Sequence, residues 1–331
     1  MRLSLFIIAL LLFITCTREL EPTLPGDGSA FGFYFLQDSS LTLHDVLDKK
    51  LDDLTPRAKP WLSANDIEFY DFSSHCIYLK KSKWALFPQY RNEFELFRAM
   101  PYKPFWVMAN NEKAYIATFH AALSSVGRYL PYIDETSFSF YPADVLPIGK
   151  VWHSHDERNN ETVKHALQND GLYHAGISVE LTDVSIVDNN DIATLDYSFS
   201  ITNNDIDDLL ILDADKMGPE RFHYFSNGPV LENSQSQRMY QSSFKGVIAP
   251  EPYDSWDPAW FSILKSGDMR SWTVRLKGYE KIEPGEYSCH FNFFHPTRIE
   301  KSERFVDSAR YWLGEINSNE IVVEFQAQHV Q

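Results

Sequence analysis

Apolar and polar residues alternate strictly in the second half of the chain. In "ATLDYSFSITN", Leu195, Tyr197, Phe199 and Ile201 alternate with polar residues. The same pattern returns in "MRSWTVRL", "GEYSCHFNFF" and "EIVVEFQ", with turn-forming clusters such as "VDNND" and "KSGD" in between. Period-two alternation is typical of antiparallel strands that bury one face. Several short strands divided by turns indicate a β-sandwich, so we predict an all-β domain over residues 173–331.

One motif refines this prediction. The segment "IEPGEY" places Pro284 and Gly285 in a turn directly before Tyr287. It resembles the tyrosine corner of immunoglobulin-like and fibronectin type III domains, in which the tyrosine hydroxyl bonds back to the backbone. Cys289 follows two residues later, as in immunoglobulin domains, but the strand at 193–203 offers it no partner cysteine. The resemblance therefore implies an immunoglobulin-like architecture in which Cys289 is a small buried side chain.

The first half mixes helical and strand patterns. "FGFYFL" and "HCIYLKK" indicate strands, and "PFWVMANNEKAYIATF" indicates a hairpin that turns at "NNEK". Ser63, followed by Asp66, is typical of a helix start, and "SKWALFPQYRNEFELFRA" predicts a helix interrupted near Pro88. "PIGKVWHS" predicts a last strand, and "NNETVKHALQNDG" a last helix that Gly171 terminates. We expect an α+β domain over residues 31–172, and hence a two-domain protein.

This order of elements resembles a known module. The succession "LSANDIEFYD", "HCIYLKK", a helix, "KPFWVMANNEKAYIATF" and "ETVKHALQNDGLY" is similar to the periplasmic head of the protein-translocase subunit SecD, which is also seen in uncharacterised bacterial lipoproteins. The resemblance implies an α+β layer fold only, and no transport activity follows from it.

The amino terminus has the pattern of a targeting signal. Arg2 precedes an apolar run over residues 3–15, which at about 1.5 Å per helical residue is too short for a hydrocarbon core about 30 Å thick. The run suits a signal peptide. Cys16 follows at once, which resembles a bacterial lipoprotein signal and implies that Cys16 is lipidated. The alternative is an ordinary secreted protein or an uncleaved anchor. Residues 16–30 contain prolines and glycines and predict a flexible tether.

Composition narrows the possible partners. The chain has 331 residues, 44% of them hydrophobic, and a formal net charge of −16. So acidic a protein repels phosphate backbones, which excludes non-specific nucleic-acid binding. Three cysteines without a C-x-x-C pair exclude a zinc ribbon. We expect the membrane, through lipidated Cys16, and an envelope protein or a glycan as partners. The oligomeric state is left open.

A histidine-rich stretch is the first candidate for chemistry. In "KVWHSHDERNNETVKH", His153 and His155 would share one face of a strand, and Asp156 could add an oxygen ligand for a metal. His165 and His174 lie further along the chain. The same residues also suit a loop that caps the next helix. A metal-dependent extracytoplasmic hydrolase and a structural loop are both compatible with this pattern.

Two further clusters offer binding chemistry. Clustered carboxylates attract calcium, and Asp205, Asp207, Asp208, Asp213 and Asp215 lie close in sequence, but the EF-hand spacing fails, so a solvated loop is the alternative. Tyr253, Trp256 and Trp260 lie in "EPYDSWDPAWF". They could stack on sugar rings or fold back over the core.

No catalytic motif accompanies these clusters. The sequence contains no G-x-S-x-G, H-E-x-x-H or glycine-rich phosphate loop. We therefore expect no cofactor, and we predict a lipid-anchored extracytoplasmic protein that acts as a non-catalytic binding or scaffolding module. The alternatives are the hydrolase through His153 and His155 and a carbohydrate-binding role for residues 253–260.

Overall fold

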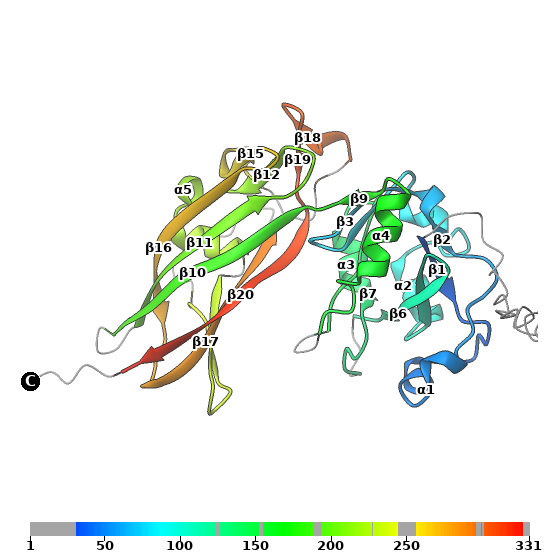
Figure 1. Cartoon of the computed structure of the whole chain (residues 1–331), viewed down its shortest axis with the longest axis horizontal. Coiled ribbons are helices and arrows are strands. Elements are labelled where there is room, and N and C mark those ends of the chain that lie inside the picture. The colour runs from blue at the N-terminus through cyan, green and yellow to red at the C-terminus, as the bar shows by residue number, and fades with distance from the viewer. Residues whose placement is uncertain are drawn as a thin grey trace, which may run out of the picture.

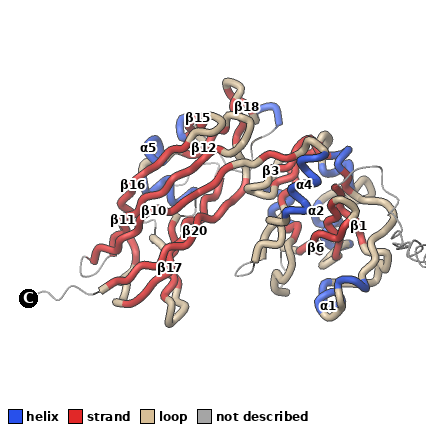
Figure 2. Tube along the Cα trace, in the orientation of Figure 1, coloured by secondary structure: helices blue, strands red, loops and turns tan. Residues whose placement is uncertain are grey.

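The computed structural model describes residues 31–122, 126–151, 155–188, 193–226, 228–243, 256–295, 299 and 301–326. Within these residues the protein is rich in β-structure, arranged in five sheets (Figures 1 and 2). We call residues 31–174 the first region and residues 177–326 the second region. Cys16, the predicted lipidation site, lies outside the described residues.

The first region holds a five-stranded sheet of order β2-β1-β5-β6-β7. Its strands are β1 (Phe31–Phe35), β2 (Leu62–Ser63), β5 (Pro104–Ala109), β6 (Glu112–His120) and β7 (Tyr132–Asp134). The predicted hairpin is confirmed, because β5 and β6 pair antiparallel around Asn110 and Asn111. Both asparagines adopt a positive φ, which a tight two-residue hairpin turn requires and which asparagine tolerates.

A second sheet in this region has the order β8-β4-β3-β9. It comprises β3 (Ile67–Asp71), β4 (Cys76–Leu79), β8 (Val145–Pro147) and β9 (Tyr173–His174). The region also contains α1 (Leu43–Leu47), α2 (Glu93–Ala99), α3 (Glu135–Phe140) and α4 (Glu161–Asn169). One apolar core joins both sheets with α2, α3 and α4, whereas α1 packs in a separate, smaller apolar cluster.

The helix predicted after Ser63 is wrong beyond its first turn. Ser63 and Asp66 form the expected capping box, but the helical turn ends at Asp66 and β3 begins at Ile67. "IEFYD" contains a β-branched and two aromatic residues, and all of its side chains except Glu68 are buried in the sheet, so pairing with β4 overrides the cap. The last helix, α4, is confirmed: Asn160 caps it and Gly171 follows its end with φ +67°.

The second region contains three sheets. The first, β10-β11-β16, comprises β10 (Ile177–Asp188), β11 (Ala193–Asn203) and β16 (Met269–Tyr279). The second, β14-β13-β17-β20, comprises β13 (Pro229–Asn233), β14 (Met239–Tyr240), β17 (Gly285–His295) and β20 (Gly314–Phe325). The third, β15-β12-β19-β18, comprises β12 (Leu209–Leu212), β15 (Phe261–Leu264), β18 (Phe305–Val306) and β19 (Ala309–Tyr311).

The alternation read from the sequence is confirmed in the long strands. The apolar positions of β11, β16 and β17 are buried, including Tyr197, Trp272 and Phe291, and they form one core. Asn319 of β20 joins the sheets at a bulge of β10, where its side-chain amide accepts from the Leu181 N–H at 2.7 Å and donates to the Leu181 carbonyl at 3.0 Å. One side chain thus replaces a missing strand partner.

Two helices interrupt the strands of the second region, where only strands were expected. They are α5 (Ala214–Met217) and α6 (Pro219–Ser226). Asp213 caps α5, and Pro219 begins α6, where its missing N–H costs nothing. Phe222 lies on the buried side of α6, and its ring centroid is 5.7 Å from that of Phe199. This helix therefore fills an end of the β core.

Candidate functional site

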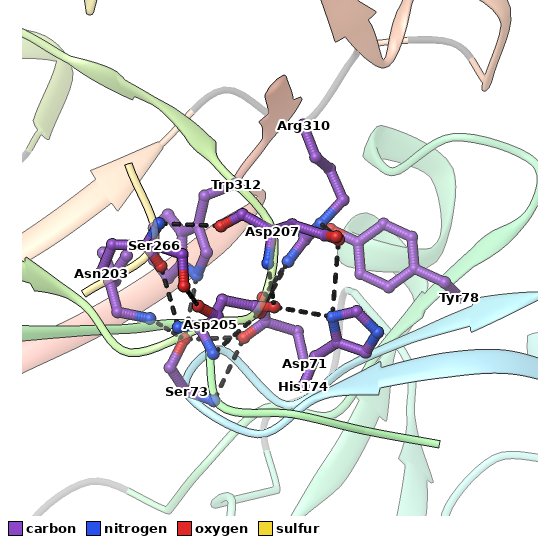
Figure 3. A network of polar contacts seen from close by, with 12 residues as sticks. Asp71, Ser73, Tyr78, His174, Asn203, Asp205, Asp207, Ser266, Arg310 and Trp312 are labelled. Atoms are coloured by element: carbon purple, nitrogen blue, oxygen red, sulfur yellow. Dashed lines mark hydrogen bonds and ion pairs between the residues drawn. The ribbon is translucent and has the colours of Figure 1, made fainter. Parts of the chain in front are cut away.

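Five ionisable residues from distant parts of the chain meet between the two regions (Figure 3). They are Asp71 at the end of β3, His174 in β9, Asp205 and Asp207 in the loop after β11, and Arg310 in β19. We call them the junction cluster. β3 and β9 run parallel, with Asp71 opposite His174, which fixes one side of the cluster.

Arg310 is the centre of this cluster. Its side chain is 0% exposed, and its Nη2 lies 3.3 Å from an oxygen of Asp71 and 3.0 Å from one of Asp205. Its Nε lies 3.5 Å from Asp207. Burial alone would lower the pKa of Arg310, but Tyr78 and the three carboxylates raise it above its usual value. The guanidinium is therefore a permanent buried cation.

Asp205 connects the histidine, the arginine and the backbone of the cluster. Its carboxylate accepts from His174 Nδ1 at 2.8 Å, from the Gly176 N–H at 3.1 Å and from the Asp207 N–H at 3.1 Å. Burial alone would raise its pKa, but the His174 hydrogen bond and the Arg310 charge lower that pKa to about 2. Asp205 is accordingly a carboxylate at any ordinary pH.

Gly176 allows this close approach. It has φ +67°, a backbone conformation that side chains rarely adopt, and a Cβ there would collide with Ser73 and Asp71. The chain passes from the first region to the second through this glycine. The cluster and the connection are thus built from the same few residues.

Aromatic rings cover the cluster on the side of the first region. Phe69 stacks on Tyr78 with centroids 4.0 Å apart, and Phe69 also lies 4.5 Å from the His174 ring. Arg310 lies over Phe69 at 4.8 Å, and Arg304 lies over Tyr78 at 4.7 Å. Cations over ring faces in a desolvated site contribute about 2 kcal/mol each.

A second buried ion pair reinforces the same contact. Arg304 is 1% exposed and donates to Asp144 at 2.6 Å. Lys301 reaches Glu68 at 2.6 Å on the surface, and Trp312 Nε1 donates to Ser73 at 2.9 Å. Residues 301–312 of the second region therefore bond to the first region at several points.

The cluster contains a possible set of metal ligands, but an arginine already lies against two of them. His174 Nδ1 and one oxygen each of Asp205 and Asp207 lie within 4.8 Å of one another, so these three residues could hold a metal ion. However, the Arg310 guanidinium already contacts both carboxylates and supplies positive charge at that place. The polar atoms of the cluster bond mainly to one another, and this arrangement joins segments up to 239 residues apart.

The histidine-rich stretch does not enter this cluster. His153 lies outside the described residues, and His155 is exposed. Asp156 binds Arg158 with both oxygens, at 2.8 and 2.7 Å. Burial alone would raise the pKa of Asp156, but its bonds to Arg158 lower it to about 2. A metal at Asp156 would have to displace this arginine, so the metal site stays a prediction.

Another histidine, His75, is engaged by the same stretch. The side-chain oxygen of Asn159 lies 3.2 Å from His75 Nε2, and Tyr70 is hydrogen-bonded to His75 Nδ1 at 3.0 Å. Burial lowers the pKa of His75 well below its usual value, so this ring is neutral at pH 7. His165 is hydrogen-bonded to Gln168 on the exposed side of α4. The stretch therefore contributes to a buried polar network of the first region.

The five acids of the run at 205–215 have three different sets of partners. Asp205 and Asp207 belong to the junction cluster, whereas Asp213 lies beside Arg270 at 2.6 Å, and Trp272 Nε1 donates to it at 3.3 Å. Asp215 shares Arg270 at 3.1 Å. Asp208 accepts from the Ser266 N–H at 2.9 Å. The five acids thus do not converge on one point.

The structure describes two of the three aromatic residues predicted to bind a glycan, Trp256 and Trp260. Tyr253 lies outside the described residues. Trp260 is buried and Trp256 half-buried, with their rings 5.1 to 5.3 Å from Phe225 and 6.2 Å from each other. Arg221 lies over the Trp260 ring at 5.5 Å. Both tryptophans pack on the main core, and glycan binding by this loop stays a prediction.

The tyrosine-corner residues have the expected local contact. Tyr287 is buried, and its hydroxyl donates to the Glu283 carbonyl at 2.5 Å, four residues upstream. Pro284 and Gly285 lie between the bonded groups, and Gly285 has φ +159°. The hydroxyl thus holds the turn that precedes β17.

Comparisons with known proteins add no relative. No protein-family model matches the chain, and no curated protein is significantly similar to it. In the part of the chain that the structure describes, no helix is both long and apolar enough to span a membrane.

Sequence reasoning missed Asp71 and Arg310 of the junction cluster, and Arg304 of the neighbouring ion pair. A signal existed for the arginine: Arg310 interrupts the apolar run of "ARYWL". A long cation within a buried strand requires an anionic partner, because an unpaired buried charge is strongly unfavourable. The identity of that partner depends on the tertiary fold.

Proposed function

We propose that this protein is a lipid-anchored, extracytoplasmic binding or scaffolding module that performs no catalysis. The observation that carries this proposal is the junction cluster, in which the buried arginine forms ion pairs with the neighbouring carboxylates. Such a cluster supports a fixed relation between the two regions, which suits a rigid platform for a partner. The anchor rests on the sequence alone, from Arg2 through Cys16.

The finer fold belongs to the same proposal. We propose an α+β domain at 31–172 and an immunoglobulin-like sandwich at 173–331. The Tyr287 contact and the buried faces of β11, β16 and β17 support it. Helices α5 and α6 depart from an all-β domain. The core of the second region also includes Phe69, Cys76, Tyr78 and Val145 of the first, so the two packing units interlock.

Acylation of Cys16 is the direct test of the anchor. Cells expressing the full chain would be fed an alkyne-bearing fatty acid, and the purified protein would be probed for the label. We expect label on the wild type and its loss in Cys16→Ser, with transfer of that variant from the membrane to the soluble fraction. Equal labelling of both proteins, or no label on either, would refute the anchor.

The absence of catalysis has a separate readout. The proposal expects the purified protein to contain no stoichiometric zinc, and it expects the melting temperature to be unchanged by a chelator. Stoichiometric zinc that His155→Ala removes would overturn this part and favour the hydrolase. His165→Ala, an exposed histidine on α4, is the matched control.

A further inference from the structure

Acidic side chains on the exposed faces of the two long sheets of the second region have different cross-strand neighbours. On β10-β11-β16, Asp196 lies directly opposite Arg275, which binds both of its oxygens at 2.6 and 2.5 Å. On β14-β13-β17-β20, Glu286 lies directly opposite Glu324, and both are exposed. Like charges facing each other across strands destabilise a sheet. The first sheet neutralises its facing acid, and the second does not.

The strand register shows that this pair belongs to a larger face. Glu232 lies beside Ser288, and Ser288 beside Val322, so these form the next row of the sheet. His290 and Glu320 form the row after that. We call the side chains of Glu232, Glu286, Glu320, Val322 and Glu324 the acidic face. Among the described residues of these four strands, no lysine or arginine occupies the outward positions.

Two observations independent of charge distinguish this face. Val322 is 64% exposed between Glu320 and Glu324, and Met239, beside Glu232, is 52% exposed. Further along β17, the alternation of the strand places Asn292 on the same side as Glu286 and Ser288. It is only 8% exposed, yet its side-chain oxygen has no hydrogen-bond donor within the described part of the protein. The surface thus combines exposed apolar side chains with carboxylates that face no lysine or arginine of these strands, and a buried acceptor without a donor among the described residues lies further along β17.

We propose that the acidic face binds a cationic polypeptide segment. Along β20, each glutamate lies two residues from Val322, or about 6.8 Å away. The complementary segment is extended and places lysine or arginine two residues on either side of an apolar side chain. Its cations would relieve the repulsion between Glu286 and Glu324, and its apolar residue would cover Val322. This inference rests on the proposed binding function and names the class of partner.

The probe is a synthetic amidated peptide with the core Lys-Thr-Val-Thr-Lys, labelled with fluorescein. A control peptide carries glutamate in place of both lysines. Fluorescence anisotropy with the full chain would measure the dissociation constant at low and at physiological salt. We expect only the lysine peptide to bind, with affinity that falls as salt rises, because salt screens exposed charges.

Matched charge reversals separate the face from net charge. Glu324→Lys should weaken binding of the lysine peptide at least tenfold. It should also raise the melting temperature of the protein by about 1–2 °C, because the new lysine and Glu286 attract each other. Glu180→Lys makes the same change on the exposed face of β10. It should alter affinity less than twofold.

Equal losses in the two variants would show that only the net charge of the protein acts. Equal binding of the lysine and glutamate peptides would show that charge plays no part in binding. Either result overturns the proposal. A Glu324→Lys protein that melts earlier than the wild type would also contradict it. Acylation of Cys16 is unaffected by these outcomes, so failure of the acidic face leaves the anchored module in place.

Discussion

Acidic residues have opposite surroundings in the junction cluster and on the acidic face. In the cluster, three carboxylates contact one buried arginine, and a histidine bonds Asp205. On the face, Glu286 and Glu324 oppose each other in solvent, and the described residues of their four strands include no arginine or lysine. The comparison teaches that acid content alone does not assign a role. The cluster uses its charge to hold the chain together, whereas the face leaves its charge available to a partner.

Removal of the central cation should have the largest effect. Arg310→Met keeps much of the side-chain volume but leaves Asp71 and Asp205 buried without their cation. Breaking a buried ion pair in this way costs about 3–5 kcal/mol of the free energy of unfolding. Urea unfolding, followed by intrinsic tryptophan fluorescence, would measure the loss.

Arg275→Met is the matched control for that variant. It removes an arginine that also binds a carboxylate with two hydrogen bonds, but at an exposed position of β16. Exposed pairs contribute about 0–1 kcal/mol. Equal destabilisation by both variants would show that the junction cluster has no special role.

Acidification should affect the cluster next most strongly. The pKa of Asp205 is about 2 in the folded protein, below its ordinary value of 3.8. Its stabilising contribution is therefore complete above about pH 4 and is lost as the pH falls towards 2. We expect a loss of about 1–2 kcal/mol from this residue. The free energy of unfolding would be measured from pH 5 to 2, and Asp205→Asn should show a shallower slope than the wild type. Equal slopes for the two proteins would show that Asp205 does not contribute to the pH dependence of stability.

The acidic face should give the smallest effect, with the opposite sign. Glu286→Gln removes one of two facing charges, so it should stabilise the protein by about 0.2–0.5 kcal/mol. Glu180→Gln, whose strand neighbour on β11 is Ser200, should change stability less. The gain for Glu286→Gln should shrink in high salt. A loss of stability would mean that Glu286 is bound by a group within the protein, and the comparison would fail.

Local structure could be predicted from the sequence where one short-range signal decides it. The alternation in β11 and β16 is enough, because a residue's side of a strand follows from its position alone. The Asn110–Asn111 turn and the Asn160 cap act within a few residues. The Ser63 cap failed as a helix predictor because the next five residues gain more from the sheet.

The candidate site could not be predicted in the same way. Asp71, Asp205 and Arg310 lie 105 to 239 residues apart along the chain, and no spacing rule connects them. The histidine-rich stretch attracted attention because its residues are adjacent, but Asp156 satisfies Arg158 within two positions. Helices α5 and α6 were missed because they are short and their buried side faces the core of β strands. Asp213 and Pro219 were nevertheless readable as their start signals.

The passage through Gly176 has a consequence for the chain as a single molecule. Between the two regions the polypeptide crosses once, at Ala175 and Gly176, whereas the contacts of Arg304, Arg310 and Trp312 cross elsewhere. A protease that cut this peptide bond would separate the covalent halves without separating the folded body. The nicked protein should migrate as one species on a native gel and as two species in denaturing detergent. The non-covalent contacts between the two regions should therefore hold them together without the peptide bond.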